Sequence, residues 1–432
     1  MQIIIPMSGV GQRFINAGFK KPKPLIKVEK KTIIEHVCNL FPGENDFIFI
    51  CNKEHLKKTN IKKILKKLKP ESKIISIDQH KKGPVYSVSK IFNLIKNQEV
   101  IISYCDYGTN WSYKNFLKYI RLKKADGAIA AYKGFHPHML GNNNYAFIKQ
   151  KKNKLIKIKE KESFTKNKMN EFASNGTYYF KKGDYVKKYF NLLLKKKIKV
   201  NNEYYVSLVY NLLTKDRLKT LIYEIDNILQ WGTPEDLNHY LQWSNYFKKN
   251  NYQKKIKLKN NINLMPLGGI GNRYKKEGFK KPKALIEINK KPMFIRAMQA
   301  LPESNSNIFV CRKEFKKNYK IKKKINLSFK NSQVKFLKNN TKGQASTCEI
   351  GLNNENNEKS LLIGTCDCSI SYNQKNLKKI INNNKNEIVV FTFRKSLAVQ
   401  KKPNDYSYVN VDKNNHVTGV SEKKKISNNP TN

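Results

Sequence analysis

Long apolar runs are absent from this sequence of 432 residues. No stretch approaches the roughly 20 apolar residues that a membrane-spanning helix needs, so no membrane span is predicted. The apolar run at the N-terminus is short and leads directly into a glycine-containing turn, which is unlike a signal peptide. We therefore expect a cytoplasmic protein.

Cysteine is also scarce. The seven cysteines are an odd number, and no two of them form a C-x-x-C pair. This argues against a disulfide framework and against the usual zinc-finger spacings, and it favours reduced thiols. Cys51 and Cys311 lie in the apolar stretches FIFIC and IFVC, which are typical of buried strands.

Acidic residues are few, because 32 Asp and Glu stand against 86 Lys and Arg, for a formal net charge of +54. Such a charge can bind a phosphate backbone by counterion release. Lysine is, however, abundant throughout the chain, and no nucleic-acid-binding motif accompanies it. We therefore expect weak affinity for polyanions but no specific nucleic-acid partner.

The first 26 residues, MQIIIPMSGVGQRFINAGFKKPKPLI, combine an apolar strand, a glycine-containing turn and a cationic cluster. Gly9 and Gly11 let the backbone approach a ligand closely, and consecutive amides in such a turn can point at one anionic group. Arg13 and Lys23 supply positive charge, and the prolines that flank Lys23 hold its segment extended. The pattern is typical of a polyphosphate site.

The same pattern recurs 260 residues later, as NLMPLGGIGNRYKKEGFKKPKALIEI from Asn263. The residues kept in the second stretch are Pro266, Gly269, Gly271, Arg273, Gly278, Phe279, Lys281, Pro282 and Lys283. Because these are kept while the residues between them change, the repeat argues against an accidental match.

Strands and helices alternate after the first loop. Residues 45–52 are typical of a buried strand, and residues 55–69 predict one basic helix. This alternation predicts a mostly parallel sheet with ligands at the carboxyl ends of its strands. Asp106 follows such a strand, as does Asp367 in the second copy. A carboxylate there is a hard oxygen ligand for Mg²⁺, and a helix cap is the alternative left open.

The N-terminal motif resembles the signature of the sugar-nucleotide pyrophosphorylases of the NTP transferase family, and most of all that of the glucose-1-phosphate thymidylyltransferases. It consists of G-x-G-x-R-F, a spacer and K-P-K-P-L. The resemblance implies an α/β fold, a Rossmann-like (GT-A-type), mostly parallel mixed sheet flanked by helices, in two tandem copies. It implies transfer of a nucleoside monophosphate from an NTP to a sugar 1-phosphate, with Mg²⁺ as cofactor. Polysaccharide precursor synthesis is the implied setting.

The resemblance also assigns roles to individual residues. The catalytic residues would be Arg13, Lys23 and Lys161, which hold the triphosphate, the α-phosphate and the sugar phosphate, and Asp106 would bind the metal. The nucleotide-binding residues would be Ser8, Gly9, Gly11, Gln79 and Gly83, with the last two reading the base unless their segment is a plain helix start. The sugar-binding residues would be Glu160, Asn175, Gly176 and Glu203. The matching residues of the second copy are Gly269, Gly271, Arg273, Lys283, Gly343, Asp367 and Lys423.

One position departs from the family pattern. Thymidylyltransferases carry a second metal-binding Asp two residues before the glycine of a Gly-Thr-Pro turn, and this chain has Gln230 there. We therefore expect a metal site with a single protein carboxylate, completed by phosphates and water.

The repeat divides the chain into a nucleotidyltransferase domain at residues 1–245, a basic linker at 246–261 and a second nucleotidyltransferase-like domain at 262–432. The second copy stops where the first enters its expected sugar-binding strand. We expect it to be truncated at its C-terminal end, or else degenerate and non-catalytic. The oligomeric state is open, with a homo-oligomer among the options.

Three other functions remain open from the sequence. The acceptor could be a phosphorylated molecule that is not a sugar, such as phosphocholine. A GT-A-type glycosyltransferase would be expected to carry a D-x-D motif, which neither Asp106 nor Asp367 forms. A regulatory protein that binds nucleotide without turnover would be compatible with Gln230.

Overall fold

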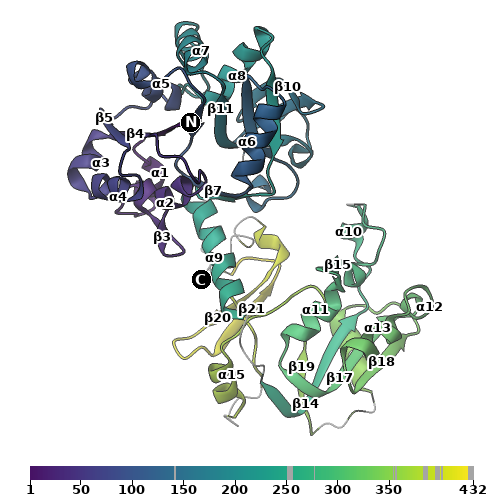
Figure 1. Cartoon of the computed structure of the whole chain (residues 1–432). Coiled ribbons are helices and arrows are strands. Elements are labelled where there is room, and N and C mark those ends of the chain that lie inside the picture. The colour runs from purple at the N-terminus through teal and green to yellow at the C-terminus, as the bar shows by residue number, and fades with distance from the viewer. Residues whose placement is uncertain are drawn as a thin grey trace. The chain divides into compact units, whose positions relative to one another are not determined.

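The computed structural model describes residues 1–140, 143–250, 256–276, 278–353, 355, 358–382, 388–394, 399 and 402–426. The chain divides into two compact units, Met1–Ser244 (unit 1) and Asn245–Asn432 (unit 2), and Figure 1 labels many of their elements. Helix α9 spans Pro234–Asn250, and strand β14 spans Lys257–Leu267. The stretch predicted as a linker, 246–261, is therefore partly helix and partly strand, and its residues 251–255 lie outside the described ones.

Among the described residues of unit 1, nine strands form one mixed sheet in the order β5-β4-β1-β6-β11-β8-β12-β10-β9. The first four strands are parallel, and β11 runs antiparallel to both β6 and β8. Strand β12 is parallel to β8, whereas β10 and β9 pair antiparallel. Their bounds are β1 Gln2–Met7, β4 Phe47–Asn52, β5 Lys73–Ile77, β6 Val100–Ser103, β8 Gly127–Tyr132, β9 Ala146–Lys151, β10 Lys154–Glu160, β11 Phe172–Phe180 and β12 Thr220–Glu224.

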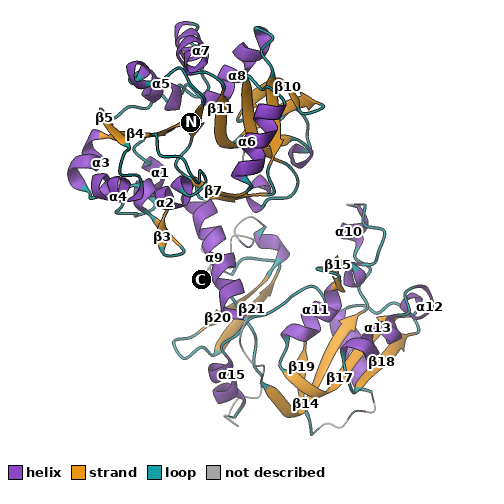
Figure 2. Ribbon diagram, viewed as in Figure 1, coloured by secondary structure: helices purple, strands orange, loops and turns teal. Residues whose placement is uncertain are grey.

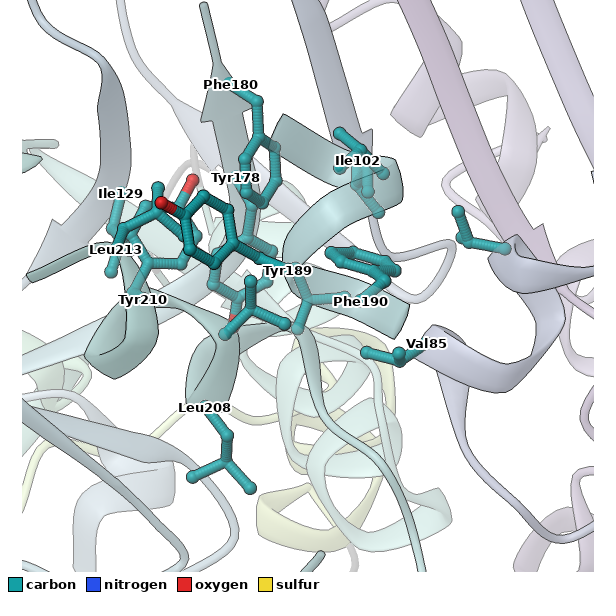
Figure 3. Packing of buried hydrophobic residues seen from close by; sticks show 14 of the residues in the cluster. Val85, Ile102, Ile129, Tyr178, Phe180, Tyr189, Phe190, Leu208, Tyr210 and Leu213 are labelled. Carbon is teal, nitrogen blue, oxygen red and sulfur yellow. The ribbon is translucent and has the colours of Figure 1, made fainter. Parts of the chain in front are cut away.

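Helices cover both faces of this sheet (Figure 2). Successive side chains of a strand point to opposite faces, so Ile4 of β1 packs with α5, α7 and α8, while Ile3 and Ile5 pack with α2, α4 and α6. Figure 3 shows part of the first cluster, where the rings of Phe180 and Phe190 lie 5.9 Å apart between centroids. The helix bounds are α1 Gln12–Asn16, α2 Ile33–Cys38, α3 Lys53–Lys58, α4 Ile61–Leu68, α5 Pro84–Ser89, α6 Tyr113–Leu122, α7 Gly183–Lys195 and α8 Val206–Lys215. The predicted α/β fold with a mixed sheet flanked by helices is confirmed.

The single basic helix predicted over residues 55–69 is two helices, α3 and α4. The Thr59 hydroxyl donates to the His55 carbonyl at 2.7 Å and accepts from the Ile61 amide at 3.3 Å. The Thr59 hydroxyl thus satisfies a backbone carbonyl at the end of α3 and a backbone amide at the start of α4. These hydrogen bonds interrupt the helix that was predicted to be continuous.

Short antiparallel pairs accompany the main sheet of unit 1. Strands β2 (Lys27–Val28) and β3 (Lys31–Thr32) form one pair, and β7 (Tyr107–Asn110) and β13 (Asn227–Gln230) form another. The second pair places the chain after Gln230 beside the chain before Tyr107, so two segments far apart in sequence meet next to the carboxyl end of β6.

Unit 2 contains a parallel four-stranded sheet in the order β18-β17-β14-β19 and a separate hairpin, β20-β21. The remaining strand bounds are β15 Glu287–Ile288, β16 Lys291–Pro292, β17 Glu303–Arg312, β18 Ser332–Leu337, β19 Ser360–Ile363, β20 Ser407–Val411 and β21 Val417–Glu422. The helices are α10 Asn272–Lys276, α11 Met293–Ala300, α12 Glu314–Asn318, α13 Ile321–Ser328, α14 Gln344–Leu352 and α15 Gln374–Ile381. None of the described helices in either unit has the length and apolar character that crossing a membrane requires.

Candidate active site

A short loop connects the carboxyl end of β1 to α1. Gly11 has a φ of +73°, in the left-handed region that favours glycine. No atom lies within 4 Å of the position that a Cβ on Gly9 would take, so the backbone is open there. The Ser8 hydroxyl lies 2.8 Å from the Ser87 hydroxyl, and the Asn52 amide donates to the Ser8 carbonyl at 3.2 Å. A neighbouring strand and helix therefore fix the start of the loop.

Lys23 begins the short 3-10 helix η1 (Lys23–Leu25) and reaches across to the end of β6. Its Nζ lies 2.6 Å from Asp106 Oδ2 and donates to the Gly232 carbonyl at 2.8 Å. The Lys23 and Asp106 side chains are 18% and 28% exposed, so the ion pair is largely shielded from water. Helix α6 is capped by Ser112, which rules out the cap role for Asp106.

Two cavities meet at this ion pair, one of about 410 Å³ (the large cavity) and one of about 230 Å³ (the small cavity). The residues that line both are Gly11, Lys23, Tyr104, Asp106, Glu203 and Tyr205. Of the other predicted residues, those on the large cavity only are Arg13, Glu160, Lys161, Asn175 and Gly176, and those on the small cavity only are Ser8, Gly9 and Gly83. Two molecules bound in these cavities would meet at Lys23 and Asp106.

Gln79 lines neither of these two cavities, so the structure does not bring it together with the other predicted nucleotide-binding residues. It is exposed, and its neighbour His80 lines the small cavity instead. His80 Nδ1 accepts from the Lys82 amide at 3.1 Å, so Nε2 carries the proton of the neutral ring, 3.0 Å from the Ser87 hydroxyl. Burial, with the charges of Lys82 and Lys90, lowers the pKa of His80 and keeps the ring neutral. These contacts fix the orientation of the His80 ring at the small cavity.

Gly83 lies against the segment that carries Glu203 and Tyr205 into the cavities. The Tyr204 amide donates to the Lys82 carbonyl at 2.9 Å, and the Val85 amide donates to the Tyr204 carbonyl at 3.1 Å. A Cβ on Gly83 would lie 2.7 and 2.8 Å from the Tyr204 backbone N and O, at a φ of +83°. Glycine is therefore required here by close backbone packing as well as by conformation.

We expect Gly83→Ala to lower the free energy of unfolding by about 3 kcal/mol, because backbone strain and a clash with backbone atoms act together. Gly43→Ala is the matched control, since Gly43 has a φ of +84° but no atom within 4 Å of its Cβ position. That variant should lose only about 1 kcal/mol. Denaturant unfolding of the two variants measures the difference, and equal losses would contradict the packing explanation.

Glu160 is the buried carboxyl of the large cavity. It ends β10, and its Oε2 accepts from the Ser207 hydroxyl at 2.5 Å. Burial raises the pKa of Glu160 to about 7, although the Ser207 hydrogen bond and the Lys161 charge act in the opposite direction. The carboxyl is therefore protonated in mildly acidic solution and becomes charged near neutral pH.

This raised pKa predicts a pH dependence of stability. Between the ordinary value of 4.5 and about 7, the folded state binds the Glu160 proton more tightly than the unfolded state does, so stability falls as the pH rises through this window. Glu160→Gln should remove this slope and unfold with a free energy about 2–3 kcal/mol higher than the wild type at pH 8. Denaturant unfolding of both proteins from pH 4.5 to 8 checks this, and parallel curves would contradict it.

Lys161 follows Glu160 in a left-handed conformation, with a φ of +60°. Its backbone amide donates to the Tyr145 carbonyl at 2.9 Å. Its Nζ lies 3.7 Å from Glu203 Oε2 and 4.9 Å from the ring centroid of Tyr205, whose hydroxyl donates to Glu203. The turn and these two side chains direct the ammonium group toward the large cavity.

Asn175 and Gly176 lie in β11, at the wall of the large cavity. Asn175 Oδ1 accepts from the Thr177 amide at 2.9 Å, whereas its buried Nδ2 and the buried Tyr104 hydroxyl have no hydrogen-bond partner among the residues that the structure describes. Gly176 has a φ of +99°, and a Cβ there would lie 3.1 Å from the Tyr104 ring. The glycine therefore allows Tyr104 to pack closely on the strand, which the sequence pattern did not indicate.

Gln230 and Asp236 also line the large cavity. Gln230 Oε1 and Asp106 Oδ2 both lie within 3.5 Å of the position that a Cβ on Gly232 would take, so these oxygens face a common point. The Asp236 carboxylate accepts from the Thr233 hydroxyl at 2.8 Å and from the Tyr145 hydroxyl at 3.5 Å. The T-x-x-D pattern was available in the sequence, but its ordinary role is to begin a helix.

The donors around this point fit a hard divalent cation. Asp106 offers a carboxylate and Gln230 an amide oxygen, and Mg²⁺ prefers oxygen ligands of this kind. Among the residues that the structure describes, no group of three or more His, Cys, Asp or Glu side chains could hold a metal. The set therefore suits an ion that also binds phosphate oxygens and water, as Mg²⁺ usually does.

The predicted residues of the second copy all lie in unit 2, which has a parallel sheet of its own. Gly269 and Gly271 follow β14, Lys283 begins the 3-10 helix η5 (Lys283–Leu285), and Asp367 follows β19. The other three are Arg273, Gly343 and Lys423.

The nucleotidyl transferase family model matches residues 2–218, just over half of the chain. Among solved structures, the chain is similar to the nucleoside-diphosphate-sugar pyrophosphorylase from Vibrio cholerae RC9, with 19% sequence identity and a TM-score of 0.47. The match covers 56% of this chain and 100% of the Vibrio cholerae chain. A putative glucose-1-phosphate thymidylyltransferase from Bacillus anthracis, in complex with a sucrose, is 18% identical, with a TM-score of 0.45. That match covers 59% of this chain and 98% of the Bacillus anthracis chain. The inositol-1-phosphate CTP transferase from T. maritima is 14% identical, with a TM-score of 0.43, and the match covers 59% of this chain and 98% of the T. maritima chain. No curated protein sequence matches the chain.

The matched range contains the loop after β1, Lys23, Asp106 and Lys161. Of these, Gly11 of the loop, Lys23 and Asp106 line both cavities, and Lys161 lines the large cavity. It ends before Gln230, so the departure at that position lies outside the match. The chain belongs to the nucleotidyl transferase family.

Proposed function

We propose that unit 1 transfers a nucleoside monophosphate from an NTP to a sugar 1-phosphate, forming an NDP-sugar and pyrophosphate. The observation that carries the proposal is the meeting of two cavities at the Lys23–Asp106 ion pair. The small cavity, next to the glycine loop, would hold the nucleoside end of the NTP. The large cavity would hold the acceptor, and the phosphates of both would meet between them.

The reaction needs no general base, because a phosphate monoester is already ionised at neutral pH. One of its oxygens attacks the α-phosphorus, the bond from that phosphorus to the α,β-bridging oxygen breaks, and pyrophosphate leaves with the bonding electron pair. Catalysis then depends on placing two anions in line and on neutralising their charge. This requirement is consistent with the presence of Arg13, Lys23 and Lys161 on the large cavity, of which Lys23 also lines the small one.

Each cation has a place in this scheme. Arg13 and the loop amides would hold the triphosphate and the departing pyrophosphate, Lys23 the α-phosphate, and Lys161 the phosphate of the acceptor. Lys23 is pre-positioned by Asp106 and the Gly232 carbonyl. Asp106, with the amide oxygen of Gln230 beside it, would hold Mg²⁺, which would neutralise phosphate charge when bound.

The lining of the large cavity supports a polyhydroxylated acceptor. Ser174, Asn175 and Tyr178 on β11 offer hydroxyl and amide groups, and Glu160 faces them from β10. Within the described part of the chain the Asn175 amide nitrogen has no hydrogen-bond partner, so a sugar hydroxyl could accept from it after a small adjustment. A ring of hydroxyls would use these groups more fully than a simple alkyl phosphate would.

Phosphocholine is the second candidate acceptor, and one observation favours it. The rings of Tyr104, Tyr145, Tyr178 and Tyr205 line the same cavity as the carboxyl groups of Glu160, Glu203 and Asp236. Aromatic faces and carboxylates together are suited to a quaternary ammonium group.

The experiment is Mg²⁺-dependent pyrophosphate release by the full chain, with each common NTP against a panel of sugar 1-phosphates and phosphocholine. Release with one NTP and one sugar 1-phosphate is expected. Release with phosphocholine alone would select the second candidate. If the chain binds NTP but releases no pyrophosphate with any acceptor, the proposal fails, and nucleotide sensing without turnover becomes the better description.

His80→Ala should raise the KM for the NTP by about tenfold, because the imidazole's hydrogen bonds shape the small cavity and are worth roughly 1–1.5 kcal/mol. Gln79→Ala is the matched control and should change the KM less than about twofold, since an exposed side chain outside the cavity contributes little. Steady-state kinetics with varied NTP measures both. A larger effect from Gln79→Ala would instead support the sequence prediction that Gln79 contacts the base.

A further inference from the structure

Unit 2 repeats the nucleotide half of unit 1, although the family match covers only residues 2–218. Strands β18, β17, β14 and β19 are parallel and stand in the same order as β5, β4, β1 and β6. β14 therefore corresponds to β1 and β19 to β6. Parallel sheets bind ligands at the carboxyl ends of their strands, and the glycine loop of unit 2 follows β14.

The backbone of this loop adopts the same special conformations as in unit 1. Gly271 has a φ of +69° and Gly278 of +84°, against +73° for Gly11 and +82° for Gly18. Pro282, before the lysine, has φ and ψ of −54° and 145°, almost the values of its counterpart in unit 1. The loop and the extended lysine segment are thus conserved in shape as well as in sequence.

The central ion pair is also repeated. Lys283 Nζ pairs with Asp367 Oδ2, and the two side chains are 26% and 33% exposed. Lys283 comes from η5 and Asp367 from the turn after β19, as their counterparts come from η1 and the turn after β6. A partly shielded cation and carboxylate beside a glycine loop form the arrangement to which we assign phosphate and metal binding in unit 1.

The hairpin of unit 2 presents a further lysine in the same way. Lys423, directly after β21, has a φ of +55° and donates its backbone amide to the Tyr406 carbonyl at 3.1 Å. Lys161 has a φ of +60° and donates to the Tyr145 carbonyl at 2.9 Å. The two lysines share both the backbone conformation and the hydrogen bond to a tyrosine carbonyl, which agrees with a repeated site.

Unit 2 differs from unit 1 in the residues that correspond to the small cavity, where we place the nucleoside. The positions of Ser8, His80 and Ser87 hold Gly268, Asn340 and Thr347. The Thr347 hydroxyl lies 2.6 Å from the Thr341 hydroxyl and donates to the Gly343 carbonyl at 2.9 Å. Gly343 itself is extended, and no atom lies within 4 Å of its Cβ position, unlike Gly83. No imidazole takes part in these contacts.

Arg273 is a second difference, because its guanidinium pairs with Asp405 at 3.2 Å on an exposed part of unit 2. A triphosphate would have to compete with Asp405 for this cation. Lys283 and the loop amides would therefore carry more of the phosphate binding than their counterparts in unit 1.

We propose that unit 2 holds a second, separate binding site for a nucleoside triphosphate, with a base pocket of different chemistry from that of unit 1. The site uses residues of unit 2 only. It does not depend on turnover in unit 1.

Equilibrium dialysis of Mg²⁺–NTP against the full chain tests this, in about 0.3 M salt to screen the weak attraction of a basic protein for polyanions. The wild type should bind two nucleotides. Lys23→Ala and Lys283→Ala should each bind one, through a loss of at least about tenfold in affinity at the altered site, and the double variant none. Lys280→Ala, an exposed lysine in the same segment, should still bind two. Thermal unfolding of each variant reports whether it is folded.

The outcomes separate this inference from the proposed function. A single wild-type site that is lost in Lys23→Ala and kept in Lys283→Ala overturns the second site alone. A single site lost only in Lys283→Ala supports it and contradicts nucleotide binding in unit 1. No wild-type site contradicts both. Identical affinity ratios among the NTPs at the two sites would overturn the proposed difference between the base pockets.

Discussion

Replacing Lys23 by alanine is expected to lower kcat for nucleotidyl transfer by about a thousandfold, because a preorganised charge at a reacting phosphate contributes on that order. The Lys23 ammonium lies where the two cavities meet, fixed by Asp106 and the Gly232 carbonyl, so it needs no reorganisation before the reaction. The variant loses this charge and leaves Asp106 uncompensated. Pyrophosphate release at saturating substrate measures the effect.

Lys20→Ala is the control for Lys23→Ala. Lys20 belongs to the same basic segment and is exposed, and it lines neither cavity. Its loss should change kcat less than about twofold, as expected for a solvated surface charge. If both variants lost the same activity, general positive charge rather than the position of Lys23 would explain the catalysis.

Asp106→Asn is the second change with a large expected effect. It keeps the shape of the side chain but removes the carboxylate that lies beside Gln230 at the Gly232 turn. We expect kcat to fall by about a hundredfold or more and half-maximal activity to require more Mg²⁺, since a neutral amide is a weaker ligand than a carboxylate. A titration of activity with Mg²⁺ measures both quantities.

Asp78→Asn provides the comparison for this variant. Asp78 also follows a parallel strand of the sheet, but its side chain is 87% exposed and pairs with Lys53 at 3.5 Å. Its replacement should leave both kcat and the Mg²⁺ requirement unchanged. An unaltered Mg²⁺ requirement in Asp106→Asn would show that the metal is held elsewhere.

The residues at the centre of the candidate site could be predicted from the sequence because simple structural rules applied to them. Lys23 and Asp106 are far apart in the chain, but Lys23 comes after the loop that follows strand β1 and Asp106 comes shortly after strand β6. The carboxyl ends of parallel strands lie at the same edge of a sheet. The structure places their charged groups 2.6 Å apart. The recurrence of the same residues after Asn263 indicated which glycines and lysines to consider.

The remaining features depend on which way single side chains point. Neighbouring polar residues such as Gln79 and His80 are equally good candidates in the sequence, and only the contacts of the His80 ring with Lys82 and Ser87 decide between them. The packing of Gly83 on Tyr204 is a long-range contact that no local pattern indicates. The break at Thr59 follows from a side-chain hydrogen bond that competes with a strong helical periodicity.

The large cavity was harder to predict for a different reason. It is built where β11 runs antiparallel between β6 and β8 and where β13 brings Gln230 beside Tyr107, and these pairings join segments far apart in the chain. Tyr104 and Tyr145 are ordinary aromatic residues in the sequence. Their role in lining the large cavity appears only once these strands are paired.

The most direct test of nucleotidyl transfer in unit 1 follows the label of an NTP carrying radioactive phosphorus at either the α or the β position. With the acceptor that supports turnover, the account predicts that the α label enters the new nucleotide-linked product while the β label leaves in pyrophosphate, and that Lys23→Ala abolishes both. Release of the label as free nucleotide or inorganic phosphate, with none in an acceptor product, would contradict the account.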